Sequence, residues 1–249
     1  MKNNIYIGNF KKSINTELFK IIFLMIIFIS FYSVLSCGFD MKYIDKAFYC
    51  ITGDYEIILL LLVILLNTFN IYKITNSNVS YILRLRKKKK YLIEIIKNIV
   101  VSDSIVYIVY IISCVIFLNL FSQKINIEIL ENYHVPNIVY LFFLTIRNYI
   151  ILMIISVFSF LSMKLFKKEL LVICVDFILL GALLIMPIYI GNIDSVLKMR
   201  FFIGFYLKIT NYGNFGLEII ITMIYIILSI IIIDLLIKII YKHVKKVGS

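Results

Sequence analysis

Ionisable side chains inside long apolar runs are the first candidates for chemistry in this sequence. Four of them are Asp103, Arg147, Asp176 and Asp234. Each would cost at least about 2.5–3.5 kcal/mol near the centre of a lipid-facing helix, so a charge retained there is expected to pair or to bind something. Helix rise places Arg147 and Asp176 about 8 Å apart in depth, which a long arginine can cover. One hypothesis is that these two residues pair; separate contacts to backbone carbonyls or the membrane surface are the alternative.

Other polar residues in the apolar runs have simpler explanations. Lys238 follows Asp234 by one helical turn and can pair with it. Asn67, Thr68 and Asn70 fall in the inner half of a predicted span, where such groups usually hydrogen-bond to a neighbouring helix at about 0.6–2 kcal/mol each. Substrate contact is the second interpretation of these amides.

The residue patterns of common membrane enzymes do not occur in the sequence. The two histidines, His134 and His243, fall on opposite sides of the predicted membrane and cannot share a metal, and there is no HExxH motif. A cysteine endopeptidase would need a thiol close to His243, and the sequence offers no obvious one. The sequence also lacks the Glu-Glu dipeptide that would indicate an intramembrane protease of the paired-glutamate type. The phosphate-loop pattern GxxxxGK[ST] does not occur either. We therefore expect no enzyme activity, no metal and no cofactor bound by this chain.

The four cysteines show no CxxC or metal-binding spacing; they are Cys37, Cys50, Cys114 and Cys174. Packing is the main interpretation of all four. Cys37 and Cys50 fall close to the predicted outer face, where a disulfide between them is the alternative.

Composition identifies the class of protein. Of the 249 residues, 62% are hydrophobic, far more than a soluble domain carries. The formal net charge of +12 does not indicate a nucleic-acid partner, because the cations cluster at the ends of apolar runs, where they set membrane orientation. We expect an all-α integral membrane protein with a single transmembrane domain over residues 1–249. Its six predicted spans cover about residues 19–36, 56–74, 98–121, 138–163, 170–190 and 217–240.

The basic run at residues 84–90 orients the six spans. Every position in it except Leu85 is lysine or arginine, and positive loops remain on the cytoplasmic side. With this run inside, most other lysines and arginines also fall inside, and both termini are cytoplasmic. Residues 1–18 predict an amphipathic helix on the inner surface; a cleaved signal sequence is the alternative for the first apolar run. Residues 37–55 and 122–137 are then outer loops.

Two segments depart from a simple alternation of spans and loops. Residues 191–216 contain an apolar stretch too short to cross a bilayer but too apolar to remain in water, which predicts a re-entrant hairpin before the last span. The third helix can begin as early as Tyr91 and run to Phe121, which is about 46 Å at 1.5 Å per residue. It would then extend beyond the bilayer into the cytoplasm.

In architecture and spacing, this arrangement resembles the permease subunits of type-2 ABC exporters, which include bacterial drug exporters and lantibiotic or bacitracin-type immunity transporters. The similar features are the surface helix, the six spans, the basic inner loop after the second span and the hairpin before the sixth. The resemblance implies that residues 79–97 form the coupling helix that docks on a separate ATPase. Its contact candidates would be Tyr81, Arg84, Leu85, Arg86, Lys87, Tyr91, Leu92, Glu94 and Ile96.

The resemblance also implies the partners. Two copies of an ABC ATPase would bind ATP and magnesium, and a second permease chain would complete a homodimer or heterodimer in the bacterial cytoplasmic membrane. The substrate would be amphipathic or hydrophobic, such as an antimicrobial peptide or drug, exported or extracted from the membrane. Two alternatives stand beside this: the basic run is a topological anchor on anionic lipid, or the chain is an ATPase-independent immunity or sensor protein acting by helix–helix contact.

Overall fold

The computed structural model describes residues 15–37, 41–77, 88–122, 127–130, 134–166, 171, 172, 174, 176 and 215–247. Within these ranges, the side chains at 54, 55, 76, 77, 88–91 and 242–247 are not described. The predicted surface helix at 1–18 and the predicted hairpin at 191–216 therefore lie almost wholly outside the described residues. Of the predicted fifth span at 170–190, residues 171, 172, 174 and 176 are described, and they are helical.

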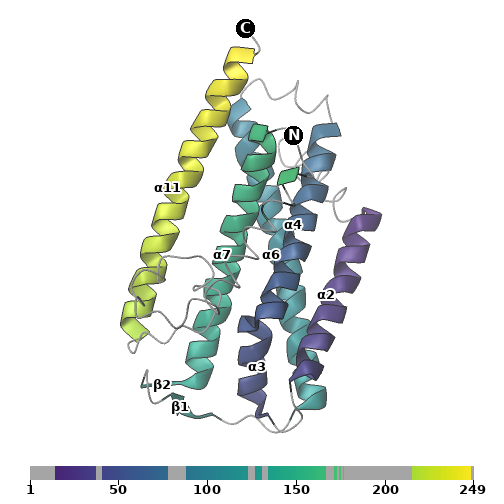
Figure 1. Cartoon of the computed structure of the whole chain (residues 1–249), viewed down its shortest axis with the longest axis vertical. Helices are drawn as coiled ribbons and strands as arrows, with labels where there is room; N and C mark the ends of the chain where they lie inside the picture. The colour runs from purple at the N-terminus through teal and green to yellow at the C-terminus, as the bar shows by residue number, and fades with distance from the viewer. Residues whose placement is uncertain are drawn as a thin grey trace, which may run out of the picture.

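Five long helices run side by side along the molecule (Figure 1). They are α2 (Glu17–Ser36), α4 (Asp54–Ser77), α6 (Lys88–Phe121), α7 (Asn137–Phe166) and α11 (Phe215–Val247). Each contains a stretch long and apolar enough to cross a membrane. They correspond to the predicted first, second, third, fourth and sixth spans. The prediction of a helical, multi-pass membrane protein is therefore confirmed over these segments.

The first span begins at a capped helix start. The side-chain oxygen of Thr16 accepts a hydrogen bond from the backbone N–H of Phe19 at 3.2 Å, which satisfies one of the free donors of the first turn. Glu17 lies in that turn, where a negative charge favours the helix dipole, and its carboxylate pairs with Lys20 at 2.7 Å. The amide of Asn70 on α4 also donates to the Thr16 hydroxyl at 2.8 Å, so the cap ties α2 to α4.

The segment predicted as an outer loop at 37–55 contains a helix, α3 (Tyr43–Thr52). The segment carries charges of both signs, but Ile44, Ala47 and Phe48 recur at helical spacing and all three are buried. The ammonium of Lys46 is buried with them and donates to the carbonyl of Phe121 at 3.3 Å. That carbonyl is at the C-terminal end of α6, where carbonyls lack helical partners and favour a cation.

A short hairpin lies in the second predicted outer loop. Strands β1 (Ile129–Leu130) and β2 (Val135–Pro136) pair antiparallel. Glu128, just before β1, accepts a hydrogen bond from Lys42 at 2.5 Å, which joins this hairpin to the segment before α3. That hydrogen bond and the negative charge of Glu128 raise the pKa of Lys42. The two segments predicted to be on the outer side therefore meet.

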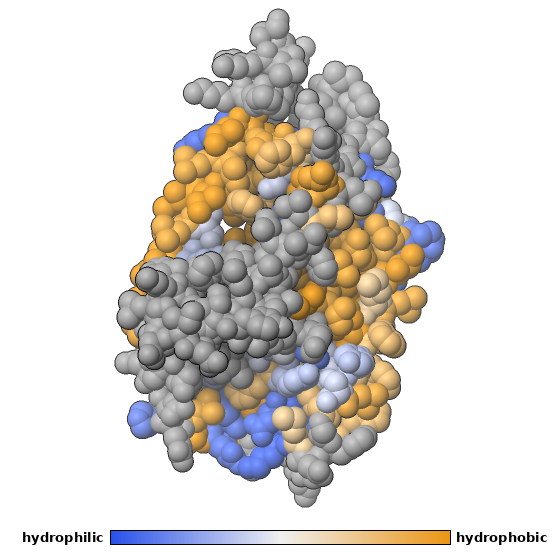
Figure 2. Space-filling view, viewed as in Figure 1, coloured by the Kyte–Doolittle hydropathy of each residue, from blue (hydrophilic) through white to orange (hydrophobic). Residues whose placement is uncertain are grey.

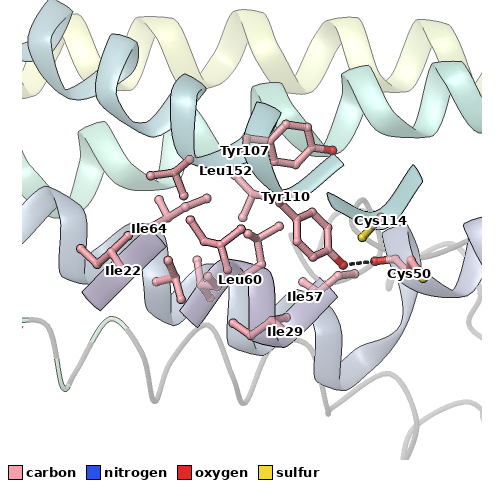
Figure 3. Packing of buried hydrophobic residues seen from close by; sticks show 14 of the residues in the cluster. Ile22, Ile29, Cys50, Ile57, Leu60, Ile64, Tyr107, Tyr110, Cys114 and Leu152 are labelled. Atoms are coloured by element: carbon pink, nitrogen blue, oxygen red, sulfur yellow. Dashed lines mark hydrogen bonds between the residues drawn. The ribbon is translucent and has the colours of Figure 1, made fainter. Parts of the chain in front are cut away.

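Apolar packing holds the helices together at both ends of the bundle. The larger cluster joins α2, α3, α4, α6 and α7, and Figure 3 shows Ile22, Leu60, Ile64 and Leu152 within it. Tyr110 lies in the same cluster and donates its hydroxyl to the carbonyl of Cys50 at 2.5 Å (Figure 3). A second cluster joins α4, α6, α7 and α11; among its members are Ile71, Ile95, Phe160 and Ile240.

Helix α11 differs from the others in how little of it is covered. Only 6% of its most apolar stretch is buried, against 61% for α4. Figure 1 places α11 at the left edge beside α7, and Figure 2 shows apolar surface over this region. Exposed residues on α11 include Ile220, Ile227, Ile231 and Leu235. In a membrane, such a surface contacts lipid or another chain.

Candidate functional site

A cluster of polar side chains lies in the interior where α4, α6 and α7 meet. It consists of Asn67 and Thr68 from α4, Ser102 and Asp103 from α6, and Ser156 from α7, and all five side chains belong to fully buried residues. We call this group the Asp103 cluster. Each member lies well inside its helix, so the helices place these groups deep in the apolar bundle.

Hydrogen bonds connect every member of the Asp103 cluster. The amide nitrogen of Asn67 donates to Asp103 Oδ1 at 2.6 Å and to the Ser102 hydroxyl at 2.9 Å. The hydroxyls of Thr68 and Ser156 lie 3.0 Å apart. Asp103 Oδ2 is within hydrogen-bonding distance of the Ser156 hydroxyl and 3.4 Å from that of Thr68.

The sequence identified Asp103 and Asn67 as polar residues inside spans but did not bring them together. The structure joins them directly, and the expectation that Asn67 bonds to a neighbouring helix is confirmed. Asn70 also fulfils it through Thr16. Among the described residues, Asp103 contacts only amide and hydroxyl groups and no cationic side chain. This carboxyl is therefore buried without an ion-pair partner.

A second polar site joins α7 to α11. The guanidinium of Arg147 forms an ion pair with Glu218 at 2.6 Å, and the two side chains are 0% and 1% exposed. The hydroxyl of Tyr140 donates to the same carboxylate at 3.2 Å. Arg147 also lies 5.9 Å from the centroid of the Phe143 ring. This site fixes the first turns of α11, a helix with little other buried surface.

The Arg147–Glu218 pair corrects the hypothesis that Arg147 pairs with Asp176. Asp176 is half-buried, and its described side chain makes no ion pair with Arg147. Glu218 was not predicted as an intramembrane residue, because it is the second residue of the last predicted span and a carboxylate there is expected at the membrane surface. Its signal was a carboxylate in the first turn of the predicted sixth span. The predicted depths did not match it to Arg147, because Arg147 falls about nine residues into its own span.

The other intramembrane prediction concerned Asp234. Its carboxylate pairs with Lys238 at 2.6 Å, one turn along α11, as expected from the spacing. The side chains are 60% exposed for Lys238 and 50% for Asp234, so this is a local pair on the helix surface.

Only some of the predicted coupling residues are among the described residues. Tyr81, Arg84, Leu85, Arg86 and Lys87 lie outside the described residues. Tyr91, Leu92, Glu94 and Ile96 lie in the first turns of α6. The side chain of Leu92 is buried in the cluster with α4, α7 and α11, while Glu94 and Ile96 are half-buried. The predicted early start of the third helix is confirmed, since α6 already begins at Lys88.

Three of the cysteines are buried free thiols; they are Cys37, Cys50 and Cys114. A hydrogen bond with Cys50 and burial raise the pKa of the Cys37 thiol. A hydrogen bond with Cys114 is the largest effect raising the pKa of the Cys50 thiol. The packing interpretation therefore fits these three residues, and Cys37 and Cys50 are adjacent thiols rather than a disulfide. Cys174 is a free thiol too and is exposed.

The two polar sites have different chemical capacities. The Arg147–Glu218 pair is internally neutral and serves as a link between helices. The Asp103 cluster holds a carboxyl among neutral donors and acceptors, which suits it to bind a small positive species. Among the described residues, no group of three or more His, Cys, Asp and Glu could hold a metal ion. The chain matches no known protein family, and neither curated proteins nor solved structures include a match.

Proposed function

We propose that this chain is the membrane subunit of an ATP-driven exporter and that it couples to a separate ATPase. The observation that carries the proposal is the continuity of α6 from the basic run into the centre of the bundle. Residue 88 belongs both to the run at 84–90 and to the first turn of α6. A force applied to that run would therefore act on one end of a single rigid helix.

The length and packing of α6 fit the role of a lever. Its 34 residues span about 51 Å, whereas the hydrocarbon core is about 30 Å thick. Ile95 and Ile99, in the first third of the helix, are fully buried against α4, α7 and α11. Asp103 lies two turns beyond Ile95 on the same helix and contacts α4 and α7. A displacement of the α6 start would therefore be transmitted to three other helices.

The arrangement of helices supports six spans with cytoplasmic termini. In Figure 1, α7 and α11 run in the same direction, so the chain must pass once between the ends of the bundle after Phe166 and before Phe215. That passage is what a fifth span would provide. The α6 start and the α11 C-terminus lie at the same end (Figure 1), and both carry lysine-rich sequence, as positive loops on the cytoplasmic side would.

The exposed apolar surface of α11 supports a partner within the membrane. A single six-span chain has little room for a substrate path, which favours a second permease chain, identical or related. An amphipathic or hydrophobic substrate, such as an antimicrobial peptide or drug, fits a path between such chains. The protein would act in the bacterial cytoplasmic membrane with two ATPase copies. The alternative is an ATPase-independent immunity or sensor protein that uses the same α11 surface for helix–helix contact.

Co-purification from membranes tests the proposal. Tagged protein is isolated in mild detergent as wild type and as a variant with Arg84, Arg86 and residues 87–90 changed to serine. The matched control changes Lys242, Lys245 and Lys246 to serine, since these cations are expected on the same side of the membrane but outside the proposed docking segment. Membrane orientation of each variant is checked by labelling from each side, because the same charges set topology.

We expect an ATPase with a phosphate loop to co-purify with wild type and with the control, and to be lost from the correctly inserted loop variant. A second variant, Val101→Pro, interrupts α6 beyond the proposed docking segment at a cost of about 3 kcal/mol in helix stability. It should retain the ATPase but abolish stimulation of ATP hydrolysis by the membrane subunit, and Val101→Ala should keep that stimulation. If no ATPase accompanies wild type, the exporter proposal is wrong and the contact-based alternative is favoured.

A further inference from the structure

We propose that Asp103 is a proton-binding site in the membrane interior, with the bound proton completing a chain of hydrogen bonds that joins α4, α6 and α7. Nothing in the proposed coupling to an ATPase requires such a site. The supporting observation is that the oxygen atoms of the Asp103 cluster make more close contacts than there are hydrogen atoms to fill them when Asp103 is ionised.

Four oxygen atoms form a chain of three close contacts, besides the longer contact of 3.4 Å between the Thr68 hydroxyl and Asp103 Oδ2. The carbonyl of Ile64 lies 3.0 Å from the Thr68 hydroxyl, which lies 3.0 Å from the Ser156 hydroxyl. The Ser156 hydroxyl in turn contacts Asp103 Oδ2. Both ends of this chain, a carbonyl and a carboxyl oxygen, can only accept when the carboxyl is ionised. The chain then has three oxygen–oxygen contacts but only the two hydroxyl hydrogens of Thr68 and Ser156.

One contact therefore lacks a hydrogen when Asp103 is ionised. If Thr68 donates to Ile64 and Ser156 donates to Asp103, the two hydroxyl oxygens face each other at 3.0 Å with only lone pairs between them. If Thr68 donates to Ser156 instead, that conflict is relieved, but the Thr68 hydroxyl gives up its bond to the Ile64 carbonyl, which keeps only its backbone donor within α4. A proton on Asp103 Oδ2 removes this deficit. Asp103 then donates to Ser156, Ser156 donates to Thr68, and Thr68 donates to the Ile64 carbonyl, so each of the three close contacts is a hydrogen bond.

The opposite side of the carboxyl group does not alter the count. Asn67 uses one amide hydrogen on Asp103 Oδ1 and the other on Ser102. Oδ1 remains an acceptor whether or not Oδ2 carries a proton, so Asn67 fits the neutral acid. The amide oxygen of Asn67 is buried without a hydrogen-bond partner, so it supplies no hydrogen either.

Among the described residues, no neighbouring charge compensates an ionised Asp103. Cations on the helices around it lie elsewhere: Arg147 pairs with Glu218, Lys73 lies over the Phe69 ring, Lys164 lies over the Tyr72 ring, Lys238 pairs with Asp234, and Lys97 is exposed. On α6 and α7, Tyr107 donates to the Thr145 carbonyl, and the Tyr149 hydroxyl lies 2.7 Å from that of Ser104. Among the described residues of α2, α3, α4, α7 and α11, none places a charged group on the Asp103 carboxyl. An unpaired ion in this position is costly, whereas the neutral acid is not.

Infrared spectroscopy of the full chain in lipid vesicles tests the proposal, because a protonated carboxyl and a carboxylate absorb at separate carbonyl frequencies. Wild type is compared with Asp103→Asn at pH 7. The matched control is Asp234→Asn, which removes a carboxylate that is half-exposed and paired with Lys238. Asparagine should be tolerated at position 103, because its amide can donate to Ser156 and accept from Asn67.

We expect a carboxylic-acid band that is lost in Asp103→Asn and retained in Asp234→Asn. Ser156→Ala should shift that band to higher frequency, because the acid loses the acceptor of its proton, and this test stands even if Asp103→Asn fails to fold. If wild type and Asp103→Asn differ only in the carboxylate region, Asp103 is ionised and the proposal is wrong. It is also wrong if the acid band appears only when sodium is replaced by choline, since sodium would then occupy the site.

Discussion

Removing one partner of the Arg147–Glu218 pair should destabilise the bundle far more than breaking an ion pair of equal length on the same helix. The two pairs suitable for comparison are Arg147–Glu218 and Asp234–Lys238, each with a nitrogen–oxygen distance of 2.6 Å. In the first pair, the side chain of Arg147 is 0% exposed and that of Glu218 is 1% exposed. In the second pair, Asp234 is 50% exposed and Lys238 is 60% exposed. The two pairs therefore have the same length but differ in burial, and only the first joins two helices.

The structure sets the expected magnitudes. Glu218→Gln removes the negative charge 2.6 Å from the buried guanidinium of Arg147, and removing one partner of a buried ion pair costs about 3–5 kcal/mol. Asp234→Asn breaks a pair between residues one turn apart near the predicted cytoplasmic end of α11, where long side chains can reach the membrane surface, and such a pair is worth about 0.3–0.5 kcal/mol. The two variants should therefore differ by at least about 2.5 kcal/mol, nearly two orders of magnitude in the unfolding equilibrium constant. Arg147→Met combined with Glu218→Gln removes both charges and should recover most of the loss.

The measurement is unfolding of each variant in mixed micelles by increasing SDS, followed by the helical circular dichroism signal. A coupling energy is obtained from Arg147→Met, Glu218→Gln and the double variant. Equal midpoints for Glu218→Gln and Asp234→Asn would refute the reasoning, because burial would then carry no penalty. If the free energy of unfolding lost in the double variant equals the sum of the losses in the two single variants, the two residues do not act as a pair.

Further predictions concern the packed interior and the thiols. Ile64→Ala, at a fully buried position, should cost about 2–5 kcal/mol in the same SDS titration, whereas Ile224→Ala, which is 51% exposed on α11, should cost much less. Tyr110→Phe removes the hydrogen bond to the Cys50 carbonyl and should lower stability by about 0.5–1.5 kcal/mol in that assay. Because the pKa of Cys37 is raised by its hydrogen bond with Cys50 and by burial, its thiol stays protonated at pH 8. Mass spectrometry should find Cys37 alkylated by iodoacetamide only after denaturation, and rapid labelling of the folded protein would contradict this.

Most of the helical architecture could be predicted from the sequence. The five described long helices match five of the predicted spans, because a run of apolar residues long enough to cross hydrocarbon has few other stable arrangements. The early start of α6 could be predicted as well, since no proline or glycine separates the basic run from the span. The Asp234–Lys238 pair was predictable for a similar reason: its geometry is set within one helical turn.

Contacts between helices were much harder to predict. Helix α3 lies in a segment that was predicted only as an outer loop, because its apolar stripe is short and interrupted by charged residues. Its burial involves a contact with the end of α6, which lies far away in the sequence. Asn67 was expected to contact another helix, but its partner could not be named. The hypothesis that Arg147 pairs with Asp176 was wrong, since the partner, Glu218, is 71 positions away and lies on a different helix.

What the sequence determined by itself is therefore which segments are helical, roughly where they begin and end, and which local pairs form along one helix. What only the tertiary structure decided is which helix faces meet, and so the composition of the Asp103 cluster and the partner of Arg147. The physical reason lies in the composition of the spans. Each helix carries apolar side chains on all of its faces, so hydropathy does not distinguish a face toward lipid from a face toward protein. The rotation of each helix is set by close packing and by the few polar groups that must find partners.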